Sequence, residues 1–229
     1  SFDLSSGRSL SYLGRFIIVL FGFLMVYMFL KRFRDYVLES RRKTFFILLL
    51  IVSSIVVTHF VYSSDVLSIY LIPFIIVPIL ITTFYETRLA LFIHLITVLL
   101  AGFYAPNSFE FIFIQFFAGM IAIIGLKKIQ RRGQFFSATL LSVMSYFLLY
   151  FGFAINQGGN FRSIEWVNFA WFAGNGILVL LSFPMVYIFE KTFNFVSDIT
   201  LLELSDSNQK LLRELAEKAP GTFQHRSEE

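Results

Sequence analysis

The sequence predicts an all-α integral membrane protein, a seven-helix transmembrane bundle with its amino end outside and its carboxyl end in the cytoplasm. Three observations support this prediction. Charged residues make up 15% of the chain and apolar residues 57%, whereas soluble domains carry about 25% charged residues. The charges gather between long apolar runs, which is typical of membrane-spanning helices. Basic residues also favour one set of alternate connections, which predicts the orientation.

The apolar runs are long enough to span, or nearly span, a bilayer core of about 30 Å at about 1.5 Å per residue. We expect spans at residues 12–30, 44–62, 66–84, 89–105, 109–126, 135–155 and 164–189. Pro73 and Pro78 lie in the third run and predict a kink, because each removes a backbone donor and frees a carbonyl that neighbouring groups must satisfy. Trp166 and Trp171 begin the seventh run and suit the headgroup level.

The orientation follows from the basic connections. The connections on one side carry Lys31, Arg32, Arg34, Arg41, Arg42, Lys43, Arg88, Lys127, Lys128, Arg131 and Arg132. The other side carries only Arg8, Arg15 and Arg162. By the positive-inside rule the first side is cytoplasmic. These basic clusters either contact anionic lipid headgroups or determine topology alone, and they do not form a nucleic-acid-binding patch.

The two ends of the chain are polar. Residues 1–11 are rich in Gly and Ser and predict a linker from an upstream portion. Residues 190–219 predict connector helices in the cytoplasm, with leucines at helical spacing. Asp206 and Gln209 form a capping-box pattern, which predicts a fresh helix near Ser207 and a hinge at residues 205–207. The Ala219-Pro220-Gly221 turn ends that helix.

The junction after the seventh run resembles one family. The matching residues are Pro184, Glu190, Phe193, Asp198, Leu202-Glu203-Leu204, Asn208, Leu211-Leu212, Leu215-Ala216 and Ala219-Pro220-Gly221-Thr222-Phe223-Gln224-His225. They are similar to the junction of bacterial seven-transmembrane receptors with an intracellular HD hydrolase domain. The resemblance implies a bacterial cytoplasmic membrane protein, with an extracytoplasmic sensor domain before the spans and a cytoplasmic HD phosphohydrolase after them. Characterised members of this family degrade cyclic di-AMP.

The resemblance also implies a metal site in the parent protein. His225 matches the first ligand of a two-metal centre of iron or manganese that activates water against a phosphodiester. Residues 220–229 would then begin the HD domain. The family continues with a His-Asp pair in an apolar helix, whereas this sequence gives Arg226–Glu229, and the sequence leaves open whether these four residues are native. One His cannot hold a catalytic metal, so we expect no catalytic residue, cofactor or hydrolase activity in these residues alone.

Polar residues inside the spans are the candidate ligand contacts. They are His59, His94, Gln115, Asn168 and Asn175. One hypothesis is that some of them, above all His59, His94, Gln115 and Asn175, line a ligand pocket or a relay. The other, which we favour, is hydrogen bonding between helices, worth about 0.6 kcal/mol on average in membrane proteins.

Glu86, between the third and fourth runs, has two predicted partners. It pairs either with Arg88 or with the basic first connection. A pair with the basic connection is one that a change of conformation would switch. A solvated turn is the simpler interpretation.

Three functions remain open. The first is a signal-transducing module that regulates the HD phosphodiesterase by a shift or rotation of the seventh span. Its coupling residues would be Glu190, Asp198, Leu204, Asp206, Leu211, Leu215 and Pro220. The second is a small-molecule transport or substrate-binding subunit, and the third is a membrane scaffold for dimerisation.

The sequence also bounds the chemistry and the partners. It holds no nucleophile elbow, zincin His pair, P-loop or cysteine. The expected partners are the lipid bilayer and the protein's own sensor and HD domains. A homodimer is left open, and no nucleic acid is expected.

Overall fold

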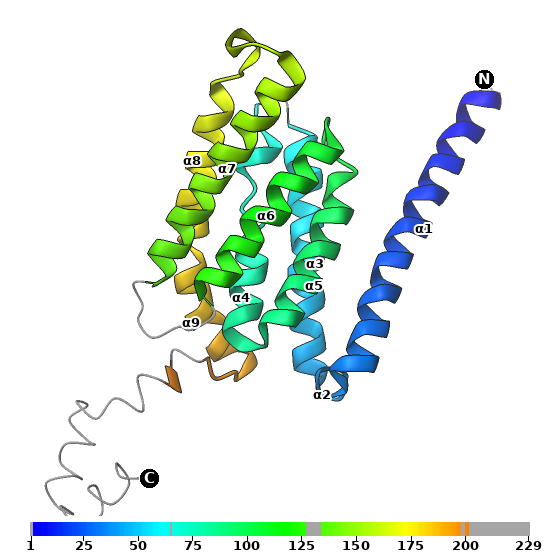
Figure 1. Ribbon diagram of the computed structural model, residues 1–229. Helices are drawn as coiled ribbons and strands as arrows, with labels where there is room; N and C mark the ends of the chain where they lie inside the picture. Colours follow the sequence, from blue (N-terminus) through cyan, green and yellow to red (C-terminus); the bar gives the residue numbers. More distant parts are fainter. Residues whose placement is uncertain (1, 65, 127–133, 198–199, 202–229) are drawn as a thin grey trace, which may run out of the picture.

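The protein is a bundle of helices (Figure 1). The computed structural model describes residues 2–64, 66–126, 134–197 and 200–201. In that part of the chain every regular element is helical. The α-helices are α1 (Phe2–Phe33), α2 (Asp35–Leu38), α3 (Arg41–Tyr62), α4 (Ile76–Phe84), α5 (Thr87–Gly102), α6 (Ser108–Leu126), α7 (Gln134–Gly158), α8 (Val167–Val179) and α9 (Ser182–Phe193). Two 3-10 helices join them, η1 (Ile69–Leu71) and η2 (Phe161–Ser163).

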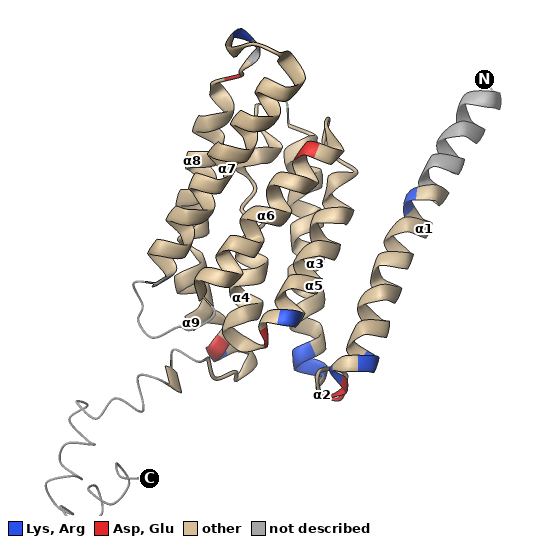
Figure 2. Ribbon diagram, in the orientation of Figure 1, with Lys and Arg blue, Asp and Glu red and all other residues tan. Residues whose placement is uncertain are grey.

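The helices run up and down between two ends of the bundle. Figure 1 places α2, the α4–α5 connection and the end of α9 at one end, here called the α2 end. The α3–η1, α5–α6 and α7–α8 connections lie at the opposite end, here called the cavity end. In Figure 2 charged residues concentrate toward these two ends, and the middle of the bundle is almost free of them. This arrangement is that of a protein whose middle lies in a membrane.

In the part of the chain that the structure describes, five helical segments are long and apolar enough to cross a membrane. They are Leu13–Phe33, Arg41–Tyr62, Ser108–Leu126, Phe135–Gly158 and Val167–Phe193. Two shorter apolar segments, Ile69–Phe84 and Thr87–Gly102, complete the bundle. The chain is therefore a multi-pass helical membrane protein, and each predicted run corresponds to one of these segments.

The centre of the bundle holds its most buried residues. Ile79 of α4, Ile93 of α5 and Ile114 of α6 are fully buried, and α5 packs against α1, α3, α4 and α6. At its periphery α1 packs chiefly against α2 and α5, and Figure 1 shows it standing apart from the other helices. Phe16 and Leu20 on α1 are exposed, as expected for side chains that face lipid.

The third apolar run, predicted as a kinked helix over residues 66–84, is broken instead. Its first part contains only η1, residues 72–75 are irregular, and α4 begins at Ile76. Pro73 removes a backbone donor at the break. Irregular backbone is tolerated at membrane depth where protein buries it, and Ile72, Phe74 and Ile75 are all buried.

The seventh apolar run, predicted as one helix over residues 164–189, is two helices. α8 ends at Val179 and α9 begins at Ser182. α9 then extends to Phe193, beyond the predicted end. Its last turn carries Lys191, which suits the negative end of the helix dipole.

Residues 2–11, which the sequence predicts as a linker from an upstream portion, are helical and continue α1. Helix propagation costs little once a helix has formed, so the apolar helix that follows extends into this polar segment. Its role as a linker to an upstream domain stays a prediction.

Candidate functional site

A polar cavity of about 650 Å³ lies at the cavity end of the bundle. Its wall is built by the end of α3, the η1 segment, the α5–α6 connection, the end of α7 and the start of α8. Four tyrosines line it, Tyr62, Tyr70, Tyr104 and Tyr150. Ligand sites in proteins are typically about 300–1,000 Å³ in volume, so this cavity has the size of a small-molecule site.

Glu110 is the most buried acid of the cavity, with 6% of its surface exposed. Three donors from three elements hold its carboxylate. The Tyr70 hydroxyl donates to Oε1 at 2.7 Å, and the side-chain amides of Asn107 and Gln157 both donate to Oε2 at 3.0 Å. Asn107 also accepts the Glu110 backbone N–H at 3.3 Å, so this pair caps the start of α6.

A second polar group lies beside the first. Asn168 donates its amide to the Tyr150 hydroxyl at 2.8 Å and to the Glu165 carboxylate at 3.1 Å. The Tyr150 ring packs against that of Tyr70, with 6.0 Å between ring centroids. Glu110 and Glu165 therefore belong to one wall of polar and aromatic groups contributed by α6, α7, α8 and η1.

His94 and Gln115, predicted as ligand contacts, lie in the buried centre and do not line the cavity. His94 Nε2 lies 2.9 Å from the Gln115 carbonyl oxygen, which only accepts, so Nε2 carries the proton. The Gln115 side chain accepts the Tyr146 hydroxyl at 2.6 Å. These bonds join α5, α6 and α7, which agrees with hydrogen bonding between helices.

Asn175 of α8, also predicted as a ligand contact, holds the broken third run. Its amide donates to the backbone carbonyls of Tyr70 at 2.9 Å and Ile72 at 2.7 Å. The side chain is fully buried. It therefore satisfies carbonyl groups that lose their helical partners near Pro73, as the sequence required of some neighbouring group.

His59 and Asn168 differ in whether they line the cavity. His59 is exposed on α3, with its ring 5.7 Å from that of Tyr104, and does not line the cavity. Asn168 does line it. The ligand-contact roles of His59, His94, Gln115 and Asn175 stay predictions.

Sequence reasoning missed Glu110, Gln157 and Glu165. One signal was present, because Asn107 and Glu110 have the spacing of a capping box. An acid in the first turn of an apolar membrane helix is also rare, and such residues often mark functional sites. Gln157 and Glu165 lie in polar connections and carry no comparable signal.

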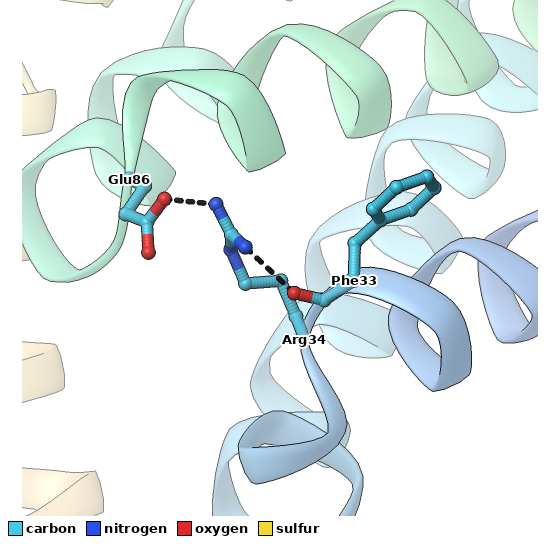
Figure 3. Close-up of polar contacts among 3 residues, drawn as sticks. All are labelled: Phe33, Arg34 and Glu86. Carbon is cyan, nitrogen blue, oxygen red and sulfur yellow. Dashed lines mark hydrogen bonds and ion pairs between the residues drawn. The ribbon is translucent and has the colours of Figure 1, made fainter.

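At the α2 end, Arg34 forms an ion pair with Glu86 (Figure 3). Arg34 occupies the break between α1 and α2, and it also donates to the Phe33 carbonyl at 2.6 Å. Of the two predicted partners for Glu86, the basic first connection is thus the one found. Burial and the Glu86 carboxylate raise the pKa of the nearby Tyr36 hydroxyl above its ordinary value.

An aromatic cluster at the same end joins the exit helix α9 to the bundle. Its centre is Phe46 of α3, which is fully buried. The rings of Phe84, Tyr85, Phe193 and Phe195 lie 5.4–6.2 Å from it, between centroids. The ring of Phe46 thus contacts both α9 and Phe195 just after it, and Phe195 also contacts Tyr85 of the α4–α5 connection.

The chain leaves the bundle through a capped break. Asn194 ends α9 in the left-handed conformation, with φ 54°. The Glu190 carboxylate then accepts the Ser197 backbone N–H at 2.9 Å and the Thr200 hydroxyl at 2.7 Å. Residues 200–201 are helical again. The break thus falls before the hinge predicted at residues 205–207.

Other predicted coupling and metal residues lie outside the described residues. They are Asp198, Leu204, Asp206, Leu211, Leu215, Pro220 and His225. Among the described residues no three His, Cys, Asp or Glu side chains are grouped to hold a metal ion. The metal centre stays an expectation of the resemblance.

A comparison of the sequence with models of known protein families identifies the family of this chain. The family model for the 7TM receptor with intracellular HD hydrolase matches residues 9–197. The chain belongs to this family. No curated protein and no solved structure matches it. The match ends at Ser197, so it covers the membrane module of the 7TM receptor family and the capped break after α9.

The two ends of the bundle carry different features, which can be compared with the parts of a 7TM receptor. The α2 end carries the exit helix α9, the aromatic cluster and the Arg34–Glu86 pair. The cavity end carries the acidic and aromatic wall. In a receptor, one site binds the stimulus and another part passes the signal on. The cavity and the junction after α9 are the candidates for these two roles, and they lie at opposite ends of the bundle.

Proposed function

We propose that this chain is the signal-transducing membrane module of a bacterial receptor whose cytoplasmic HD domain hydrolyses cyclic di-AMP. All seven apolar segments would cross the cytoplasmic membrane, with the amino end outside. The family match carries the proposal. Three described basic residues support the orientation, because Lys31 lies in the last turn of α1, Arg41 begins α3 and Arg88 lies in the first turn of α5, all next to the α2 end.

The α2 end supplies a physical route for the signal. The exit helix α9 contacts Phe46 of α3 through Phe189 and Phe193. Phe195, just after α9, contacts Phe84 at the end of α4 and Tyr85 in the α4–α5 connection. Packed side chains favour discrete arrangements over continuous deformation. A shift of α3 or α4 would thus move α9 and the break at Asn194 as one unit, and so reposition the HD domain.

Hydrolysis by the full-length protein in lipid nanodiscs tests the proposal. One, two, three or four alanines inserted after Leu212, inside the predicted connector helix, would rotate the HD domain about the connector by about 100° per residue. We expect hydrolysis of cyclic di-AMP to rise and fall with that rotation. The same insertions in the isolated HD domain with its connector serve as control and should change the rate little. Equal rates across the full-length series would contradict transmission by rotation.

Substrate class needs a separate measurement. We expect the full-length protein to release a linear dinucleotide from cyclic di-AMP faster than from cyclic di-GMP, with iron or manganese bound. Comparable rates on both, or activity on neither, would contradict the substrate assigned here while leaving the membrane module untouched.

The absence of cysteine allows a clean test of orientation. A membrane-impermeant maleimide added to intact cells should label Ser64→Cys at the cavity end. It should label Glu39→Cys at the α2 end only after permeabilisation. The reverse pattern would overturn the proposed orientation.

A further inference from the structure

The cavity end carries a feature that signal transmission does not explain. Glu110 is buried in a membrane-protein cavity and held by three neutral donors, Tyr70, Asn107 and Gln157. Capping of α6 accounts for the Asn107 contact alone. Tyr70 comes from η1 and Gln157 from α7, so three separate elements converge to fix the orientation of this carboxylate.

The carboxylate of Glu110 can accept one more hydrogen bond than the described residues donate to it. An ionised carboxylate accepts about four hydrogen bonds, two at each oxygen. Oε2 receives two from the described residues, and Oε1 receives one from Tyr70. The remaining acceptor position is therefore on Oε1.

Among the described residues that line the cavity, no cationic side chain balances its negative charge. Glu110 and Glu165 both line it, and the described lining includes no Lys, Arg or His. Within the described chain the ion pair found is Arg34–Glu86, at the other end of the bundle. A buried carboxylate that faces only neutral donors is strongly stabilised by a cation, so the electrostatics of this cavity select a positively charged ligand.

The cavity walls favour an organic cation over a small metal ion. Tyr62, Tyr70, Tyr104 and Tyr150 surround a volume of about 650 Å³, far larger than one ion requires. Aromatic faces attract ammonium groups by about 0.5–2 kcal/mol and also cover an apolar body. By contrast, Ca²⁺ and Mg²⁺ take several oxygen ligands at short distance, and aromatic walls do not supply them.

We propose that this cavity binds an organic ammonium compound with an aromatic or apolar body. Its ammonium group donates to Oε1 of Glu110, and its body packs against the tyrosines. Glu165 at the rim attracts the cation. Binding here is independent of the hydrolase and stands whatever substrate the HD domain takes.

The test is binding of 2-phenylethylammonium to the membrane module in lipid nanodiscs, measured by calorimetry. Two probes of similar shape, neutral 3-phenylpropanol and anionic 3-phenylpropionate, separate charge recognition from partition into lipid. We expect saturable binding of the ammonium compound, with affinity at least about tenfold above either analogue, a difference of about 1.4 kcal/mol. Empty nanodiscs give the lipid background.

Variants locate the site. Glu110→Gln removes the charge at nearly constant size, and we expect it to weaken binding at least about tenfold. Glu165→Gln should weaken it less, because that side chain is exposed. Glu39→Gln makes the same change on the exposed α2 end and should leave the affinity unaltered.

Two results would overturn the proposal. One is the lack of saturable binding of the ammonium compound by the wild-type module, or equal binding of all three probes. The other is wild-type affinity in folded Glu110→Gln. Should that variant fail to fold, the charge selectivity of the wild-type protein still decides. Loss of cyclic di-AMP hydrolysis would not bear on either result.

Discussion

The side chain of Asn175 donates to the backbone carbonyl of Tyr70 at 2.9 Å, across 105 residues of sequence. The same Tyr70 donates its hydroxyl to Glu110 in the cavity. One residue of η1 thus joins the cavity to the buried break in the third run. A ligand that moved Tyr70 would therefore act on the broken backbone of the third run, to which Asn175 is bonded.

Replacement of Asn175 should destabilise this break. Asn175→Ala leaves the carbonyls of Tyr70 and Ile72 without the amide, and we expect a loss of about 1–2 kcal/mol. Asn175→Asp should cost more, because it turns a carboxylate toward two carbonyl oxygens. Thermal unfolding in detergent micelles measures both. Ile177→Ala, on the same helix and 69% exposed, should cost much less, and equal losses at the two positions would contradict the role assigned to the amide.

Gly119 of α6 is required by His94 of α5. A Cβ added at Gly119 would lie 2.0 Å from His94 Nε2, so the ring would have to leave the Gln115 carbonyl. We expect Gly119→Ala to destabilise the protein by about 1–3 kcal/mol, the usual cost of overpacking. Gly152→Ala is the matched control, because nothing lies within 4 Å of its added Cβ, and Ala favours a helix over Gly.

A double-variant cycle sharpens this prediction. In a His94→Ala background the clash is gone, so Gly119→Ala should cost less than it does alone. Unfolding of the four proteins gives the coupling between the two positions. Additive losses would show that the small size of Gly119 serves some other neighbour.

The Arg34–Glu86 pair should contribute little to stability. The Glu86 side chain is 53% exposed, and exposed pairs are worth about 0.2–1 kcal/mol and weaken with salt. A cycle of Arg34→Ala and Glu86→Ala should give a coupling in that range at low salt and less at high salt. Arg32→Ala, a basic control in the same region, should show no coupling to Glu86. A coupling that ignores salt would contradict the surface character of the pair.

The positions of the apolar runs could be predicted from the sequence, because a bilayer imposes a length and a composition on whatever crosses it. The break in the third run could be predicted only as a kink. The helix is interrupted completely because Asn175 bonds to the freed Tyr70 carbonyl. No local sequence pattern reveals that contact. The break at Asn194 was within reach, since Asn tolerates the left-handed conformation and Ser197 precedes Thr200 at capping distance.

The cavity could not be predicted for a different reason. Its wall combines Tyr70 of η1, Glu110 of α6, Gln157 of α7 and Glu165 of the connection before α8. Each residue is unremarkable in its own segment, apart from the capping pattern of Asn107 and Glu110. The predicted ligand contacts His59, His94, Gln115 and Asn175 share only polarity within apolar runs, and polarity alone does not distinguish a helix contact from a cavity wall.

Glu190 is where a signal leaving the bundle should be most sensitive to substitution. Its Oε1 accepts both the Ser197 N–H and the Thr200 hydroxyl. Glu190→Ala removes both bonds and frees the segment after Asn194 to turn independently of α9. We expect the hydrolysis rate of the full-length protein to lose its dependence on the membrane module and approach that of the isolated HD domain with its connector.

The conservative variant separates the acceptor from the charge. Glu190→Gln keeps one carbonyl oxygen that can take the same two bonds, so its rate should stay close to wild type if position of the acceptor is what matters. Lys191→Ala, at the exposed neighbouring position, should leave the rate unchanged. If Glu190→Gln instead behaves like Glu190→Ala, the carboxylate charge is the essential property. If neither variant changes the rate, the junction is not the route of the signal, because transmission through a helix end requires the next segment to be held to it.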